Sequence, residues 1–150
     1  MSHFGPAADP PSPDLSETLA TLRAAAEETR LRVLALLAEG ELSVSDLTDI
    51  LGQSQPRISR HLKLLVEAGL VERHREGAWA FFRLADQSAA AKILRPILVA
   101  VDRDDPQIAD DRARLAAVRA QRAASAQTFF ARLAPEWDRV RSLHVSEEAA

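Results

Sequence analysis

The stretch from Ser43 to Gly69 constrains the fold more than any other, because its spacing predicts two short helices joined by a tight turn. Ser43 and Asp46 have the S-x-x-D spacing of a capping box, which predicts the start of a helix. Gly52 predicts the end of that helix, since glycine readily takes the left-handed conformation found there. Ser54 predicts the cap of a second helix, which Gly69 ends. The stretch therefore has the pattern of a helix-turn-helix.

The second helix of this stretch divides into an apolar and a polar face. Its predicted buried stripe, at helical spacing, consists of Ile58, Leu62, Leu65 and Val66. Arginine and glutamine on the opposite face match guanine and adenine in a major groove, and serine can hold phosphates. The candidate DNA-binding residues here are Ser54, Gln55, Arg57, Ser59, Arg60, His61 and Lys63. A merely solvated helix face is the alternative interpretation.

After this helix the hydrophobic period changes from 3.6 to 2, which indicates β-structure. Leu70 to Arg75 and Ala78 to Leu84 are predicted strands, with Glu76-Gly77 as a tight hairpin turn. A hairpin directly behind a recognition helix is typical of a wing. Arg73 and Arg75 are therefore candidate contacts to phosphate or the minor groove, and a solvated hairpin tip is the alternative.

The segments before this stretch divide into a tail and two helices. Residues 1–13 contain four of the eight prolines, and we expect a disordered tail. Asp14 and Glu17 predict the start of a first helix, and a second is predicted from about Glu28 to Ala38. Residues 14–84 are thus predicted to form one winged helix-turn-helix domain, mainly α with a small β-hairpin.

Residues 85–150 are predicted to form a helical dimerisation or connector region. Asp86 is the expected cap of a helix that runs to Val101, and the acidic run from Asp102 to Asp105 is an expected break. A long helix is predicted from Ile108 to about Leu133, with Pro135 restarting a short one. The region's apolar stripe consists of Leu115, Val118, Phe129, Phe130, Leu133, Trp137, Val140 and Leu143. We interpret this stripe as a dimer interface, and core against the winged domain is the alternative.

Charge and composition agree with a nucleic-acid partner. The 150-residue chain has a formal net charge of −3, but residues 53–83 carry six basic and three acidic side chains. The positive charge therefore gathers on the predicted reading surface, where double-stranded DNA is the expected partner. No apolar run is long enough to span a membrane, and no secretory signal is evident, so we expect a cytoplasmic protein.

Residues 28–84 resemble the winged-helix domain of the ArsR/SmtB repressors. The most specific parts of the resemblance are TRLRVL, SQPRISRHLKLL, AGLV and REG. The resemblance implies a homodimeric transcriptional repressor that leaves its operator when an inducer binds. The closing run FFARLAPEWDRVRSLHV also resembles the connector of fusions between an ArsR-type domain and a methyltransferase. A dimerisation module of such a fusion, without DNA binding, is the alternative function.

The chain departs from many members of that family in its metal ligands. It has no cysteine, and its four histidines form no i, i+4 pair, so we expect no metal site and no thiolate sensing. No arrangement typical of a catalytic site stands out, and we expect no enzyme. We therefore expect either no effector or a small organic one, with S-adenosylmethionine or S-adenosylhomocysteine as first candidates. Its pocket is expected near the aromatic residues Trp79, Phe129, Phe130 and Trp137.

Overall fold

The computed structural model describes residues 12–149, with side chains as far as residue 133. It divides by internal contacts into two compact units, the first ending at Leu115 and the second beginning at Ala116. The functional boundary predicted after Leu84 stays a prediction. The elements are α1 (Leu15–Ala25), α2 (Glu28–Leu37), β1 (Leu42–Ser43), α3 (Val44–Leu51), α4 (Gln55–Glu67), β2 (Val71–Glu76), β3 (Trp79–Leu84), α5 (Ala89–Ala100) and α6 (Pro106–Ala149).

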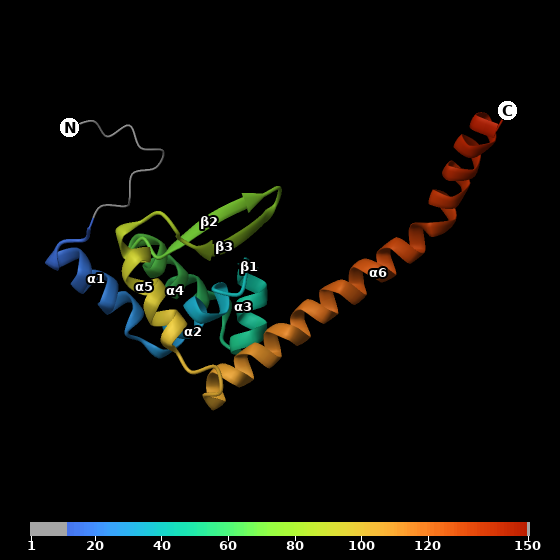
Figure 1. The fold of residues 1–150 in the computed structure, drawn as a ribbon. Coiled ribbons are helices and arrows are strands. Elements are labelled where there is room, and N and C mark those ends of the chain that lie inside the picture. Colours follow the sequence, from blue (N-terminus) through green and yellow to red (C-terminus); the bar gives the residue numbers. More distant parts are fainter. Residues whose placement is uncertain (1–11, 150) are drawn as a thin grey trace, which may run out of the picture. The chain divides into compact units, whose positions relative to one another are not determined.

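The core of the first unit lies where the apolar faces of α2, α3 and α4 meet. α1 packs beside α5, while β2 and β3 form a hairpin that projects from the helices (Figure 1). The largest fully buried side chains come from these helices, from β1, α5 and the start of the hairpin: Val33, Leu34, Leu36, Leu42, Leu47, Ile50, Ile58, Leu62, Leu65, Leu70 and Leu94. The mainly α fold with a small sheet is as the sequence predicts.

Two predicted helix caps are confirmed. The Asp14 carboxylate accepts a hydrogen bond from the backbone N–H of Glu17 at 2.7 Å, which starts α1. At α3, Ser43 Oγ accepts from the N–H of Asp46 at 3.2 Å. The Asp46 carboxylate in turn accepts from the N–H of Ser43 at 2.8 Å. Both bonds of the predicted capping box are therefore present, and α3 starts at a fixed residue.

Two other caps differ from the prediction. Ser54 stands at the N-cap position of α4, but its side chain makes no capping hydrogen bond. Asp86 does not cap α5, because Ser88 does so by accepting from the N–H of Ala91 at 3.0 Å. The hydroxyl of Ser88 also donates to the carbonyl of Gly69 at 2.6 Å. The Ser88 hydroxyl therefore links the start of α5 to the end of α4, and sequence spacing alone does not reveal the bond to Gly69.

The hairpin belongs to a three-stranded antiparallel sheet of order β1-β3-β2. Strand β1 was not predicted from the sequence; it is only two residues long and pairs Leu42 with Phe82. The predicted turn was wrong by one residue, since Glu76 pairs with Trp79 and the loop is therefore Gly77 and Ala78. Gly77 has φ of +62°, a left-handed conformation that favours glycine in a two-residue hairpin loop.

Two predicted apolar residues lie in other surroundings than expected. Val66 was predicted to belong to the buried stripe of α4. It is 38% exposed, because it lines the open groove between α4 and the hairpin. Leu115 was assigned to a dimer stripe, yet it is buried to 2% exposure in the first unit. Leu115 therefore belongs to the core of that unit, and the alternative interpretation holds for this residue.

The second unit is the continuation of α6 from Ala116. The expected restart at Pro135 was wrong, because α6 continues through this residue without a break. Phe129 and Phe130 are each about 60% exposed and meet edge to face at 5.9 Å. The side chains of Trp137, Val140 and Leu143 lie outside the described residues, as does most of the predicted tail. A role for this stripe in dimerisation stays a prediction. No helix in the described part of the chain is long and apolar enough to cross a membrane.

Candidate nucleic-acid interface

The position of α4 is fixed by the turn that precedes it. Gly52 has φ of +64°, which reverses the chain directly after α3. Its backbone N–H donates to the carbonyl of Thr48 at 2.9 Å, so this carbonyl in the last turn of α3 has a hydrogen-bond donor. The next residue, Gln53, donates from Nε2 to Thr29 Oγ1 at 3.0 Å and ties the turn to α2. These bonds hold the first turn of α4 in one orientation.

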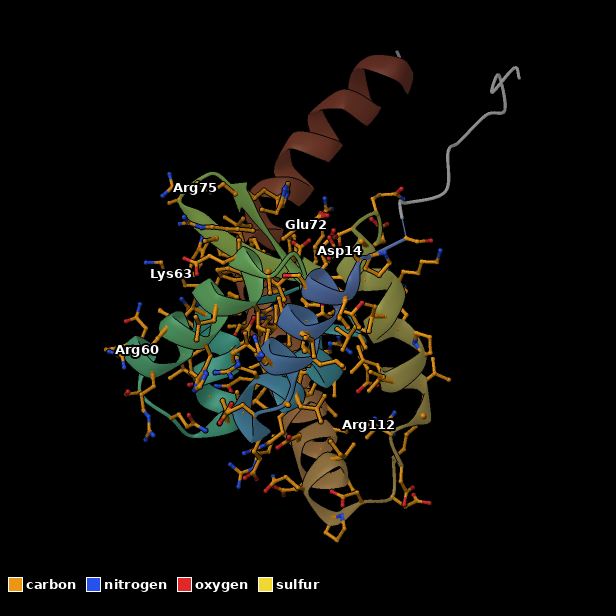
Figure 2. The ribbon with its side chains drawn as sticks, turned by 90° about the vertical axis from the view of Figure 1, so that its left-hand side faces the viewer. Asp14, Arg60, Lys63, Glu72, Arg75 and Arg112 are labelled. Atoms are coloured by element: carbon orange, nitrogen blue, oxygen red, sulfur yellow. The ribbon has the colours of Figure 1, made fainter. Side chains whose placement is uncertain are left out.

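The outer face of α4 carries the polar residues that the sequence predicted. Ile58, Leu62 and Leu65 are buried, whereas Arg57, Arg60 and Lys63 are exposed. Figure 2 shows Arg60 and Lys63 projecting from α4 on the same side of the molecule as Arg75. In the described part of the chain none of these cations takes part in an ion pair. Their charges are therefore available to phosphates.

The hairpin places a second set of cations beside α4. Arg73 and Arg75 are exposed on β2, where Arg73 pairs with Phe82 and Arg75 with Ala80. Because residues alternate between the two faces of a strand, both arginines lie on the face that also carries the buried Phe82. That face is directed towards the helices. The alternation predicted for β3 is confirmed, with Phe82 inside and Trp79 outside.

A groove of about 730 Å³ runs between α4 and the hairpin. Its polar lining includes Lys63 from α4, Arg73 from β2 and Ser45 from the first turn of α3. Its apolar lining includes Val66 and Trp79. The groove therefore joins the two predicted contact surfaces, the recognition helix and the wing, in one concave face.

His61 differs from the other candidates in its surroundings. Its side chain is 17% exposed, and its Nδ1 lies 3.8 Å from the carboxylate of Glu27 and 3.4 Å from Nη1 of Arg30. Partial burial opposes ionisation of Glu27, but hydrogen bonds from the backbone N–H groups of Arg30 and Thr29 outweigh it. These bonds, with the nearby charges of His61 and Arg30, lower the pKa of Glu27 below its usual 4.5. His61 thus contacts the N-terminus of α2, and a DNA contact for it stays a prediction.

The structure brings most of the predicted site residues to one surface. Exposed residues on α4, at its N-cap and on β2 are Ser54, Gln55, Arg57, Ser59, Arg60, Lys63, Arg73 and Arg75. Sequence reasoning missed Ser45 and Trp79 as lining residues of the groove. An exposed aromatic residue one position after a hairpin turn was the available signal for Trp79.

Three side chains that can ligate a metal lie close together, two on β2 and one directly before β1. Single donor atoms of Glu41, His74 and Glu76 all lie within 4.8 Å of one another among the described residues. The sequence did not reveal this cluster, because Glu41 is distant from the hairpin along the chain. Exposed acidic groups often gather without a metal, and we assign none here.

A smaller cavity of about 90 Å³ lies where α2, the end of α5 and the start of α6 meet. Arg32 and Asp111 line it and form an ion pair of 2.9 Å. Its lining contains no aromatic residue, and its volume is well below the roughly 300–1,000 Å³ of pockets for drug-sized ligands. This cavity lacks the aromatic wall expected of a site for an adenosyl effector.

The fold and the site together define a winged helix-turn-helix. The sequence model of the family described as bacterial regulatory protein, arsR family, matches residues 27–73. The arsenical resistance operon repressor of Escherichia coli is 51% identical over 46% of this chain and 62% of its own length. An uncharacterized HTH-type transcriptional regulator of Methanocaldococcus jannaschii is 43% identical over 43% of this chain and 73% of its own.

A solved structure agrees with these matches. The homodimeric winged helix-turn-helix DNA-binding domain of a possible ArsR-family transcriptional regulator from Mycobacterium bovis is 32% identical, with a TM-score of 0.51. The match covers 57% of this chain and 80% of that domain. The chain belongs to the arsR family of bacterial regulatory proteins. The chain spans less than two thirds of the length of two of the repressors it matches. It covers 62% of the Escherichia coli repressor and 47% of an arsenic resistance regulator from Pseudomonas putida.

Proposed function

We propose that this protein is a sequence-specific, DNA-binding transcriptional repressor that acts as a homodimer in the cytoplasm. The observation that carries the proposal is the set of exposed cations on α4 and β2. Lys63 and Arg73 line one groove, and none of the set has an ion-pair partner among the described residues. Arginine on a recognition helix reads guanine, and cations on a wing neutralise phosphates. Relatives of the chain are named repressors, which supports the same function.

The proposed dimer forms through α1 and α5. These helices pack together, and both leave apolar side chains exposed, among them Leu15 at 76% and Val99 at 86%. Covering such side chains with a second copy removes apolar surface from water. A twofold dimer presents one α4 to each half of an imperfect palindrome, with half-sites about one helical turn apart.

The proposed inducer is a small organic molecule, since a chain without cysteine offers no thiolate ligand. S-adenosylmethionine and S-adenosylhomocysteine stay predictions. Such a ligand weakens operator binding only by its difference in affinity between the two conformations of the dimer. Calorimetry with both compounds, with zinc as the comparison, tests this part of the proposal. Tight zinc binding without a response to either compound would contradict it.

The DNA-binding proposal is tested by fluorescence anisotropy with duplexes from the region upstream of the protein's own coding sequence. We expect Arg57→Ala and Arg60→Ala each to weaken operator binding by about 1–3 kcal/mol if the side chain contacts a base. The matched control is Arg103→Ala, which removes the same charge from the exposed loop between α5 and α6. Unchanged operator affinity in both α4 variants would show that the reading surface is assigned wrongly.

A further inference from the structure

The cavity beside the start of α6 contains a cation that no acidic side chain of the lining neutralises. Its volume is about 90 Å³, and it lies between α2, the end of α5, the loop that follows α5 and the start of α6. The charged residues of its lining are Arg32, Glu39, Arg103, Asp111 and Arg112. Three cations thus accompany two carboxylates, so the lining carries a net charge of +1.

Four of these five charges are already paired. Arg32 lies 2.9 Å from Asp111, and Arg112 lies 3.1 Å from Glu39. Arg103 is exposed and takes part in no ion pair among the described residues. An anion can therefore bind the guanidinium of Arg103 without breaking an existing ion pair.

The acidic residues next to Arg103 in the sequence do not fill the cavity. Oδ1 of Asp102 accepts a hydrogen bond from the backbone N–H of Asp104 at 2.9 Å. Oδ2 of Asp105 accepts one from the backbone N–H of Gln107 at 3.0 Å. None of these three carboxylates belongs to the cavity lining. Their negative charges nevertheless oppose an anion nearby, so we expect weak binding.

The other side of the cavity is aliphatic. Its wall consists of Ala35 and Leu36 from α2, Leu98 and Val101 from the end of α5, and Ile108 from α6. A cavity of about 150 Å³ holds benzene, so the smaller volume here leaves room for roughly four non-hydrogen atoms of an apolar body. A carboxylate is the anionic group that matches the planar fork of a guanidinium. The wall and the cation together therefore fit a short chain that ends in a carboxylate.

We propose that this cavity binds an aliphatic carboxylate of about three to five carbons. Its carboxylate pairs with Arg103 at the rim, and its chain packs against Ala35, Leu98 and Ile108. A neutral molecule has no charge for Arg103, and an inorganic anion has no chain for the aliphatic wall.

The cavity lies between two helices on which the proposed operator binding depends. α2 is tied to the turn before α4 by the hydrogen bond from Gln53 to Thr29, and α5 belongs to the proposed dimer interface. The inference rests on the proposed repressor function, and it gives the small organic inducer a chemical class and a site. A carboxylate that binds better to the conformation with low DNA affinity weakens operator binding by that difference.

The first experiment measures binding alone, by NMR titration of the ¹⁵N-labelled protein with isobutyrate. We expect saturable shifts with a Kd on the order of 1 mM, as for a tight-fitting ligand of this size. Isobutyramide, which has the same shape without the charge, and acetate, which has the charge without the chain, should each bind about tenfold more weakly. Arg103→Gln and the cavity-filling Ala35→Leu should lose affinity to a similar degree. Arg95→Gln, on the exposed side of α5 outside the lining, is the matched control and should bind isobutyrate like the unmodified protein.

The second experiment measures operator affinity by fluorescence anisotropy with and without saturating isobutyrate. We expect the ligand to weaken operator binding about tenfold, within the usual range of coupling between two sites, and to have no effect in Arg103→Gln. Absence of saturable shifts far above the expected Kd, or equal isobutyrate affinity in Arg103→Gln and the unmodified protein, would overturn the site. Binding of isobutyrate without any change in operator affinity would overturn its role as inducer. Failure of the ligand-free protein to bind any duplex would instead overturn the proposed function, and the titration would still decide whether the site exists.

Discussion

The ion pair between Arg32 and Asp111 offers a sharp test of what holds the start of α6 to the winged domain. Nε and Nη2 of Arg32 each donate to one oxygen of Asp111 at 2.9 Å. Gln107 donates from Nε2 to Oδ1 of the same carboxylate at 3.0 Å. The Asp111 side chain is 3% exposed and that of Arg32 15%. The hydrogen bonds to Asp111 raise the pKa of Arg32 further, so its guanidinium is charged at neutral pH.

The expected loss follows from the guanidinium that Asp111→Ala leaves behind. Removing one partner of a buried ion pair costs about 3–5 kcal/mol, because the other charge stays buried without compensation. The exposed part of Arg32 keeps some hydration, so we expect a loss of about 3 kcal/mol in the free energy of unfolding. Replacing both residues by apolar ones, as in Arg32→Met with Asp111→Leu, should be nearly neutral, since no uncompensated charge remains.

The assay is denaturation by urea, followed by far-UV circular dichroism. The matched control is Asp110→Ala, one residue earlier on α6, whose ion pair with Arg114 is half exposed on both sides. Exposed pairs of this kind contribute at most about 1 kcal/mol. Equal losses for Asp110→Ala and Asp111→Ala would refute the reasoning. A double variant as unstable as Asp111→Ala would refute it as well, since burial of an unpaired charge would then not be the cause.

Three further predictions concern caps, turns and assembly. Gly52→Ala should lower the free energy of unfolding by about 1–2 kcal/mol. The cause is backbone strain alone, because the added Cβ meets no atom closer than 4.0 Å. Gly52→Asn should cost less in the same denaturation assay. The lowered pKa of Glu27 means that its stabilising contribution is present above pH 4.5 and is lost as the pH falls through its folded-state pKa. The acid-induced fall in Tm should therefore be smaller in Glu27→Gln, and an unchanged fall would contradict this. Leu19→Glu on the exposed face of α1 should give a monomer by sedimentation, and a persisting dimer would move the interface elsewhere.

Features with a local physical cause could be predicted from the sequence. The capping box of Ser43 and Asp46 is contained in four consecutive residues, and both of its hydrogen bonds form as expected. Gly52 and Gly69 both have positive φ, as expected of glycines that end helices. The exposed face of α4 follows from helical spacing in the same way. These features define the fold class and most of the candidate site, because none of them depends on a distant segment.

Features with a tertiary cause could not be predicted in this way. Ser88 caps α5 in place of Asp86 because its hydroxyl also reaches the carbonyl of Gly69, nineteen residues earlier. His61 has the helical position of a reading residue, yet its ring contacts Glu27 at the start of α2. The spacing of residues along one helix does not reveal which other element packs against its side. The same limit applies to Lys63 and Arg73, which line one groove because of the way the hairpin lies against α4.

Ser43 explains why the wing and the helix-turn-helix keep a fixed relation to each other. It pairs with Phe81 as the second residue of β1, and it is also the N-cap residue of α3. The residue that ends the short strand thus starts the first helix of the motif, with no linker between them. The hairpin is therefore attached through β3 directly to the N-terminus of α3, and Gln53 ties the next turn to α2. Because no flexible segment separates these elements, the spacing between the cations of α4 and those of β2 is determined by the fold itself.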